Sequence, residues 1–389
     1  MKRFVIFAVL TIVVAALIGV GVTLNKWGAF LPKYEQDTDR FMESRRVAMD
    51  VPGMAVGIVG TGGITWEGYY GTYDGEHPVS EDTVFMIASV SKTVIATALM
   101  QLWEQELFDL DDDVNTYLDF EVRNPHHPEA AITFRQLMTH HASIADRYPF
   151  YDEMYTIAEG GGDSPWNLDE FLQAYLVPGG QFYSTDNYLE SAPGEGFEYS
   201  NYGAALLAYL VEVLSGEDFA DYCHRYIFQP LGMKHSYYLI RDIPASETEI
   251  ASPFSEDKAL PHYSYPDYPA GSLRTTIRDL ARFASFYLDP AASNAAILQP
   301  ETIALMFDKY SESSDLGEGE MGLIWVHMDW MFFKAIGHTG GDPGVATTLL
   351  LYPDDGFGTI IFINGEPTSF VLMREVTGRL RDEGQRLTQ

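Results

Sequence analysis

Cysteine is almost absent from this chain of 389 residues, because Cys223 is the only one. A single cysteine excludes an internal disulfide, and its place in an apolar and aromatic run predicts a buried thiol without a nucleophilic role. Positive charge is also scarce, with 24 Lys and Arg against 56 Asp and Glu and a formal net charge of −32. Because the phosphates of a nucleic acid would be repelled, the composition argues against nucleic acid as a partner.

Two common catalytic signatures are missing as well. The sequence contains no His-Glu-x-x-His, and the adjacent pairs His126–His127 and His140–His141 direct neighbouring side chains to different sides. We therefore expect a protein that needs neither a metal nor another cofactor. The sequence also contains no Gly-x-Ser-x-Gly, which argues against the α/β-hydrolase fold.

An uncharged apolar run extends from Phe4 to Leu24, directly after Lys2 and Arg3. At about 1.5 Å per residue, this run spans roughly 30 Å, the thickness of a bilayer core. It is longer than the apolar part of a usual signal peptide, and no clear Ala-x-Ala site follows. We predict that residues 1–30 are an uncleaved signal anchor, with a cleaved signal peptide as the alternative. In both cases the remainder is exported to the periplasm or the cell exterior.

The first chemical motif is Ser89-Val90-Ser91-Lys92, which precedes an apolar run from Thr93 to Leu102. This run predicts a buried helix with Ser89 near its N-terminus, where backbone N–H groups favour a developing negative charge. Serine and lysine three residues apart share one helix face, so the lysine ammonium can lie beside the serine hydroxyl, which is a weak nucleophile until a neighbour takes its proton. The same spacing recurs at 255–258, but two flanking prolines and several charges there indicate a solvated loop.

Two later segments complete the motif. Tyr199-Ser200-Asn201 follows a turn that contains glycine and precedes an apolar run that predicts a helix. A tyrosine in that position can project into a cleft, although the nearby triplet 185–187 is a similar candidate. The third segment is His338-Thr339-Gly340-Gly341, between two apolar runs. This pattern predicts a hairpin with the glycine-rich backbone at its turn, where a substrate carbonyl can approach the main chain.

In this order, Ser-x-x-Lys, Tyr-x-Asn and a basic residue before Thr-Gly resemble the penicillin-recognising serine hydrolases. These comprise class C β-lactamases, D-alanyl-D-alanine carboxypeptidases and related esterases. Residues 132–141 and 269–283 resemble the same family, so that the resemblance covers about residues 40–385. It favours Tyr199 over the triplet at 185–187 as part of the second element.

The resemblance implies acyl transfer through a covalent ester of Ser89. Lys92 and Tyr199 are then a hydrogen-bonded pair that takes the serine proton and delivers it to the leaving group. Asn201 orients Lys92 and the substrate amide. The backbone N–H groups of Ser89 and Gly341 form the oxyanion hole.

The remaining residues of the third segment, Thr339, Gly340 and His338, are implied to bind substrate. His338 stands where many family members carry lysine, and it would bind a carboxylate or a hydroxyl and join the proton network. The missing permanent charge favours an esterase or peptidase-like enzyme over a dedicated β-lactamase. A β-lactamase or D-alanyl-D-alanine carboxypeptidase is the alternative, and a non-catalytic relative that binds cell-wall peptides is a further one. The aromatic-rich segment from Tyr148 to Tyr188 favours a pocket with apolar walls for a small-molecule or peptide substrate.

Strand patterns lie at both ends of the chain, at 54–59 and 64–69 and again at 321–328, 345–352 and 358–364. Helices are expected at 36–50 and 369–386, and the stretch of about 105–290 looks mostly helical with long loops. The pattern predicts an α+β fold, in which one antiparallel sheet is flanked by helices and carries an inserted, mostly helical domain. The resemblance implies the same β-lactamase/transpeptidase-like arrangement, with residues 31–389 as the hydrolase domain and 105–290 as its helical subdomain.

Overall fold

The computed structural model describes residues 35–244, 248–291, 295–313, 319–330 and 333–388. The signal anchor expected at residues 1–30 lies outside this part of the chain. Within the described residues, the model has no helix with the length and apolar character needed to cross a membrane. The membrane anchor therefore stays a prediction.

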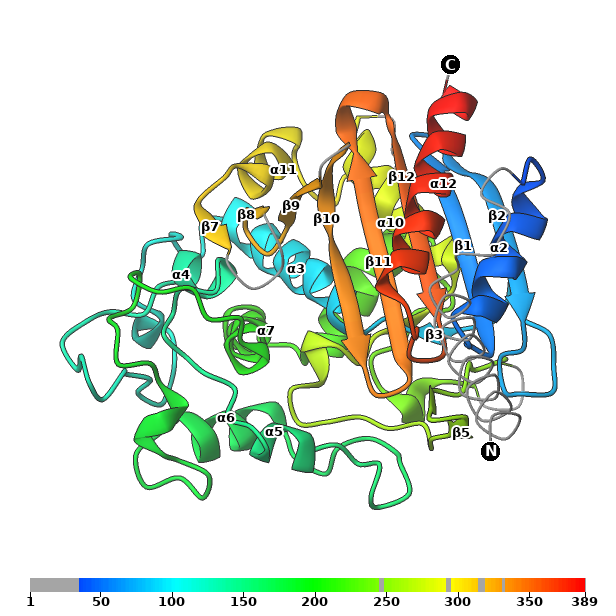
Figure 1. Ribbon diagram of the computed structural model, residues 1–389. Helices are drawn as coiled ribbons and strands as arrows, with labels where there is room; N and C mark the ends of the chain where they lie inside the picture. The colour runs from blue at the N-terminus through cyan, green and yellow to red at the C-terminus, as the bar shows by residue number, and fades with distance from the viewer. Residues whose placement is uncertain (1–34, 245–247, 292–294, 314–318, 331–332, 389) are drawn as a thin grey trace, which may run out of the picture.

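One antiparallel sheet organises the molecule, with the strand order β2-β1-β12-β11-β10-β9-β8-β7. β1 pairs with β12 along most of its length, from Met54 opposite Ile363 to Gly60 opposite Phe357. Strands from the N-terminal and the C-terminal parts of the chain therefore lie side by side in the sheet (Figure 1). The strands of this sheet are β1 (Gly53–Gly60), β2 (Gly63–Gly71), β7 (Ser311–Ser313), β8 (Gly319–Met321), β9 (Val326–Trp330), β10 (Phe333–Asp342), β11 (Val345–Tyr352) and β12 (Phe357–Ile363).

Four of the expected strands are confirmed as β1, β2, β11 and β12, but a continuous strand over 321–328 is wrong. Between β8 and β9 the backbone of Leu323 and Ile324 donates to carbonyls of two helices, those of Met306 and Met138. Ile324 has a φ of 70°, and both side chains are fully buried. A buried apolar loop has the same hydrophobic pattern as a buried strand, which explains the error.

The glycine-rich segment around His338 is also not a turn. Residues 338–341 lie inside β10, and the hairpin turn falls at Pro343–Gly344. A Cβ on Gly337 would lie 2.0 Å from the carbonyl oxygen of Leu349, and a Cβ on Gly340 would lie 2.6 Å from that of Ile87. These glycines are therefore required by close packing of the strand, not by the geometry of a turn.

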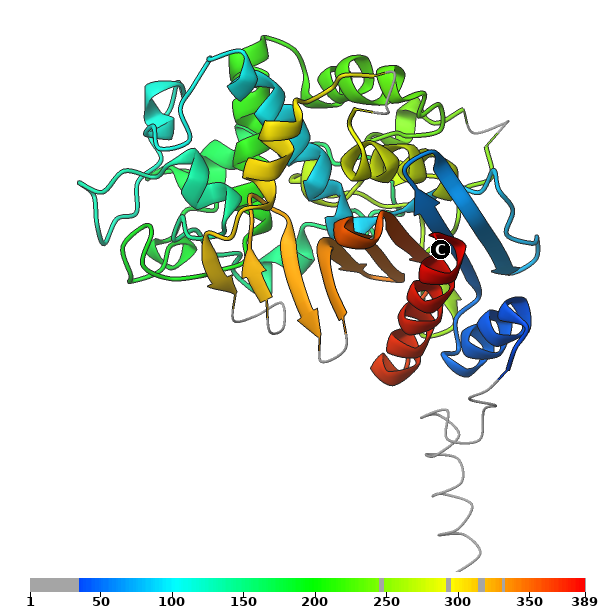
Figure 2. The same cartoon turned by 90° about the horizontal axis from the view of Figure 1, so that it is seen from above.

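Helices cover both faces of the sheet (Figure 2). α2 and α12 cover one face, where Phe41 and Met42 of α2 and Leu372 and Val376 of α12 are buried in a common core. The opposite face packs on α10 and, at β10 and β11, directly on the turn of residues Ala88–Ser91, which leads into the helical part of the molecule. The helices are α2 (Thr38–Ala48), α3 (Lys92–Glu104), α4 (Phe134–Met138), α5 (Phe150–Glu153), α6 (Leu168–Leu176), α7 (Asn201–Ser215), α8 (Phe219–Cys223), α9 (Gln229–Leu231), α10 (Ile277–Leu288), α11 (Pro300–Phe307) and α12 (Phe370–Thr388).

The segment expected to be mostly helical, 105–290, holds α4 to α10 and, of the strands, the two-residue β4 (Phe254–Ser255), β5 (Lys258–Ala259) and β6 (Arg274–Thr275). β6 pairs with β3 (Phe85–Met86), just before Ser89. The expected buried thiol is confirmed, since Cys223 is fully buried at the end of α8. α10, however, belongs with the sheet, because it packs against β1, β2 and β12.

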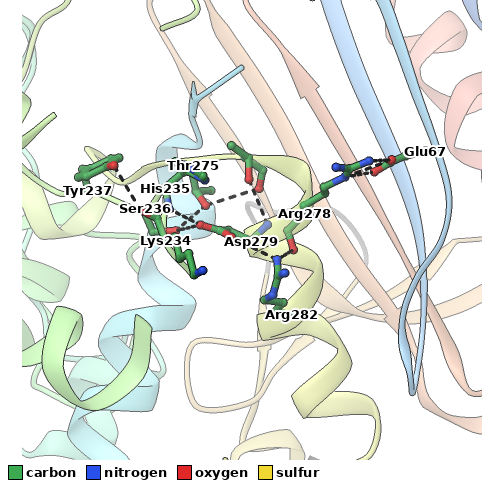
Figure 3. Close-up of polar contacts among 10 residues, drawn as sticks. Glu67, Lys234, His235, Ser236, Tyr237, Thr275, Arg278, Asp279 and Arg282 are labelled. Atoms are coloured by element: carbon green, nitrogen blue, oxygen red, sulfur yellow. Dashed lines mark hydrogen bonds and ion pairs between the residues drawn. The ribbon is translucent and has the colours of Figure 1, made fainter. Parts of the chain in front are cut away.

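Two neighbouring residues of α10 tie the sheet to the helical part (Figure 3). Arg278 forms an ion pair with Glu67 of β2. Asp279 accepts hydrogen bonds from the backbone N–H of His235, at 2.6 Å, and from the Ser236 hydroxyl, at 3.2 Å. This helix thus fixes how the two halves meet, and the candidate site lies where they meet.

Candidate active site

Ser89 lies in a single 3₁₀ turn, η1 (Ala88–Ser91), which leads directly into α3. α3 is buried on all sides of its first two turns, so the sequence-based expectation of a buried helix with Ser89 at its start is confirmed. Ala88, the residue before the serine, has a φ of 46°. A residue other than glycine in the left-handed region carries strain that the surrounding packing must hold, and such strain is typical of functional positions.

Lys92 is fully buried, and its Nζ has three oxygen partners. It lies 3.0 Å from Ser89 Oγ, 2.7 Å from Asn201 Oδ1 and 2.9 Å from the carbonyl oxygen of Ala270. A charged ammonium donates a proton to each of the three oxygens. A neutral amine donates to Asn201 and Ala270 and accepts the Ser89 proton with its lone pair. The geometry therefore fits both protonation states of Lys92.

Tyr199 does not pair with Lys92 as expected from the sequence. Lys92 Nζ lies 5.0 Å from the centroid of the Tyr199 ring, and no hydrogen bond joins it to the phenol within the described residues. The three oxygen partners of Nζ leave it without a proton for the tyrosine. The Tyr199 ring instead lies beside two histidine rings, with its centroid 4.5 Å from that of His140 and 6.3 Å from that of His338.

Asn201 is the first residue of α7, and a buried carboxylate fixes its backbone. Asp146 accepts from Asn201 N at 2.6 Å, from Tyr202 N at 3.1 Å and from the Ser200 hydroxyl at 2.7 Å. Burial raises the pKa of Asp146, and these three donors oppose that rise. An anion at a helix N-terminus satisfies free N–H groups and favours the helix dipole. Asp146 could not be predicted from the sequence, because no motif or periodic pattern marks it.

His338 is buried in β10 as a neutral imidazole. Its Nδ1 lies 2.6 Å from the carbonyl oxygen of Thr339, so Nδ1 carries the proton, and Nε2 is a buried acceptor that has no partner in the described part of the chain. Burial and the nearby Lys92 lower the pKa of His338 to about 3. A neutral ring gives a substrate carboxylate no charge to bind, whereas its Nε2 can still accept from a hydroxyl.

The free edge of β10 faces the nucleophile. Pairing with β9 ends at Gly337, so that residues 338–342 pair with β11 alone. A Cβ built on Gly341 would meet no atom within 4 Å, which leaves its backbone open on the pocket side. In an antiparallel pair, the backbone N–H groups of successive residues point alternately toward the partner strand and away from it. The N–H groups of Thr339 and Gly341 are the ones that point away from β11, toward the free edge of β10. That orientation is the one the predicted oxyanion role of Gly341 requires.

These groups surround a pocket of about 580 Å³. Four of the predicted site residues contribute to its wall, while Lys92 and His338 are buried behind it. The apolar wall expected from the aromatic segment is only partly right, because carboxylates interrupt the aromatic rings. The lining residues are Ser89, Tyr148, Tyr151, Asp152, Tyr155, Tyr199, Asn201, Tyr265, Gly341, Asp342, Pro343, Val345, Glu366 and Pro367.

The two rejected motif copies have structural roles. Residues 255–258 form the exposed turn between β4 and β5. The amide of Asn187, in the triplet 185–187, donates to the carbonyls of Tyr175 and Phe182 inside the helical part. Neither copy contributes to the pocket wall.

Comparison with known proteins agrees with this geometry. The model of the family described as Beta-lactamase matches residues 38–380. The unguisins hydrolase ungD' of Aspergillus campestris is 24% identical over 85% of this chain and 61% of its own length. Penicillin-binding protein 4 of Amycolatopsis lactamdurans is 26% identical over 78% of each chain. The octameric penicillin-binding protein homologue of Pyrococcus abyssi has a TM-score of 0.74 at 23% identity, over 88% of this chain and 77% of the other.

The chain therefore belongs to the beta-lactamase family, and its fold is the β-lactamase/transpeptidase-like one. Its relatives include a hydrolase and penicillin-binding proteins. It spans 61% of the length of the unguisins hydrolase, less than two thirds of that relative.

Proposed function

We propose that this protein is an exported acyl hydrolase that cleaves esters, amides or cell-wall-type peptides through a covalent ester of Ser89. The observation that carries the proposal is the 3.0 Å contact between Lys92 Nζ and Ser89 Oγ, inside a pocket wall. In this proposal the apolar run at 4–24 anchors the enzyme to the membrane and leaves its catalytic domain outside the cytoplasm.

The contacts support a role for each group in the proposed reaction. Lys92, as a neutral amine, takes the Ser89 proton while Asn201 and the carbonyl of Ala270 hold it in place. Tyr199 lines the pocket beside Ser89, where its hydroxyl can donate to the leaving group. The N–H groups of Ser89 and Gly341 stabilise the oxyanion of the tetrahedral intermediate.

A β-lactamase or a D-alanyl-D-alanine carboxypeptidase is the second candidate, and the names of the penicillin-binding relatives favour it. Both substrates carry a carboxylate, which is bound best by a permanent cation. The neutral His338 supports an ester or amide substrate without that group. A non-catalytic relative is disfavoured, since Ser89, Lys92 and Asn201 are not only present but in contact.

The test uses the full chain with two probes, 4-nitrophenyl butyrate and benzylpenicillin. We expect turnover of the ester that is lost in Ser89→Ala and kept in the matched control Ser91→Ala, whose buried hydroxyl has no partner among the residues that the structure describes. Intact mass after mixing with benzylpenicillin separates the alternatives. A stable adduct on Ser89 indicates the carboxypeptidase, consumed drug indicates the β-lactamase, and intact drug with ester turnover supports the proposal. Ester turnover that survives in Ser89→Ala, or that is absent from the wild type, contradicts it.

A further inference from the structure

The pocket beside Ser89 is negatively charged along one side. Asp342 lies next to Gly341 on β10, while Asp152 and Glu366 are exposed at the mouth. Among the described residues that line the pocket, there is no lysine, arginine or histidine. A ligand that enters this space therefore meets carboxylates as the charged groups of the wall.

Asp342 is held by groups that leave its charge uncompensated. Its two oxygens accept hydrogen bonds from the phenols of Tyr155, at 2.6 Å, and Tyr265, at 3.0 Å. No ion pair to Asp342 forms within the part of the chain that the structure describes, and each oxygen keeps a further lone pair. A Cβ on Gly271 would lie 1.9 Å from the Tyr265 phenol oxygen and 3.2 Å from Asp342, so this glycine makes room for the pair.

Aromatic rings surround the same carboxylate. The ring of Tyr155 lies edge-to-face with those of Tyr151, Tyr263 and Tyr265, at centroid distances of 5.7, 5.4 and 4.9 Å. Burial raises the pKa of Tyr151 and Tyr265, so these rings stay neutral phenols. A neutral aromatic face attracts an ammonium group, and a cage of several such faces is a known way to bind one.

A further carboxyl group lies directly behind this aromatic wall. Asp267 is fully buried and accepts from the Tyr151 phenol at 3.3 Å through one oxygen, while its other oxygen has no partner among the described residues. Burial raises the pKa of Asp267 to about 8, so this carboxyl is neutral at pH 7. It therefore adds no positive charge that could offset the carboxylates of the pocket wall.

The nearby cations do not change this balance. Lys92 is already shared among three oxygens. Arg274 is buried, and its guanidinium donates to the carbonyls of Ser272 and Tyr263. Neither side chain lines the pocket, so an anionic substrate group would face Asp342 without a counter-charge.

We propose that the pocket selects substrates with a protonated amine close to the scissile carbonyl, and that Asp342 is its main counter-charge, with Asp152 and Glu366 at the mouth. The position of the amine follows from the chain, because Asp342 directly follows Gly341, the predicted oxyanion residue, and adjacent Cα atoms are about 3.8 Å apart. The inference rests on the proposed function, since it specifies the acyl group that Ser89 receives.

The test compares phenyl esters of three types of acyl group, which differ only in the substituent at the α-carbon. These are the esters of phenylalanine in both enantiomers, of 3-phenylpropionic acid, and the monophenyl ester of benzylmalonic acid, which carry an ammonium, a hydrogen and a carboxylate. Each kcat/KM is divided by the rate of hydroxide-catalysed hydrolysis of the same ester. We expect one phenylalanine enantiomer to exceed the neutral ester by about tenfold or more, the size of one well-placed charge interaction, and the anionic ester to be the poorest.

Variants then assign the effect to the carboxylates. Asp342→Asn should reduce the ratio of ammonium to neutral ester by about tenfold. Because this change also weakens one phenol hydrogen bond, Asp152→Asn, at an exposed position, serves as a second variant with a smaller loss in the same ratio. The matched control is Glu153→Gln, a neighbouring exposed carboxylate of α5 that does not line the pocket, and this variant should keep the wild-type ratio.

The outcomes separate this inference from the proposed function. Hydrolysis of the neutral ester that depends on Ser89, without any preference for the ammonium ester, overturns the cation preference and leaves the acyl hydrolase intact. A preference that persists in both Asp342→Asn and Asp152→Asn overturns the assignment to these residues. The absence of Ser89-dependent hydrolysis of all the esters overturns the proposed function itself.

Discussion

Behind one end of the pocket, the buried Lys92 has three oxygen partners within 3.0 Å, whereas at the other end Asp342 has two phenol donors and, among the described residues, no ion-pair partner. The first arrangement satisfies every proton of an ammonium and fixes the geometry around Ser89. The second keeps a negative charge available beside the same nucleophile. The difference teaches that the contacts of the nucleophile and the counter-charge stand on separate elements, η1, α3 and α7 for the first and β10 with the tyrosine-rich loops for the second.

The largest expected effect comes from a substitution of Lys92. Lys92→Arg keeps the positive charge but removes the capacity to accept a proton, because arginine stays charged in proteins. We expect kcat to fall by about 10³-fold or more, as for other residues that act as a unit with the nucleophile. The measurement is ester turnover with thermal unfolding as the control for folding. A variant with more than about a tenth of wild-type activity would mean that Lys92 acts through its charge and not as the base.

A smaller effect is expected from moving β10 away from the turn that holds Ser89. Gly340→Ala places a Cβ 2.6 Å from the carbonyl oxygen of Ile87 and 2.4 Å from Thr347 Oγ1, so β10 must shift away from the turn that holds Ser89. Overpacking of this kind destabilises by about 1–3 kcal/mol, and a displacement of about 1 Å reduces kcat by up to about 10²-fold. Gly62→Ala is the matched control, because its Cβ would meet no atom within 4 Å. Equal melting temperatures and rates in the two variants would refute the close-packing argument.

The smallest expected effect is the pH dependence of the substrate preference that Asp342 provides. Burial raises the pKa of Asp342 to about 6 from an ordinary value of 3.8, against the opposing hydrogen bonds of Tyr155 and Tyr265. The carboxylate is therefore charged above about pH 6 and protonated below it. The preference for the ammonium ester should fall by about tenfold or less as pH falls through 6, while an α-amino group, with a pKa near 7.7, keeps its charge.

Other charged groups near Asp342 do not obscure its titration around pH 6. Lys92 and Arg274 interact with it at longer range, and the pKa of the buried Asp267 is raised to about 8, above the window. The effect on folding has the opposite sign, because a carboxyl with a raised pKa binds its proton more tightly in the folded chain. Its contribution to stability therefore decreases as pH rises from about 3.8 to 6. A preference that is flat between about pH 5 and 7 would show that Asp342 does not supply the counter-charge.

The strands and helices near the chain ends were predictable, because their patterns are long and regular. β11 matches its expected range residue for residue, since a run of apolar residues bounded by a Gly turn and a Pro leaves little choice. The loop between β8 and β9 was not predictable, because the backbone N–H groups of its buried residues donate to carbonyls of helices and not to a strand. The glycines of β10 were wrongly predicted to form a turn for a related reason. A glycine-rich sequence does not show that the backbone of another segment packs closely against these residues.

The motif residues around Ser89 could be found from their spacing, but their partners could not. The carbonyl of Ala270 lies 178 positions along the chain from Lys92, and any residue type offers a carbonyl. Asp146 caps α7 from 55 positions away, and Tyr155 reaches Asp342 from 187 positions away. Such pairs arise from tertiary packing, which local patterns do not encode.

The pairing of β1 with β12 has a consequence for the biosynthesis of the enzyme. Ser89 and Lys92 are translated early, but the strand that completes the sheet beside β1 comes some 300 positions after it. β10, which forms one side of the pocket, also leaves the ribosome late. A nascent or truncated chain would thus hold its nucleophile without a finished pocket, so that hydrolysis begins only when almost the entire chain has emerged and closed this long-range contact.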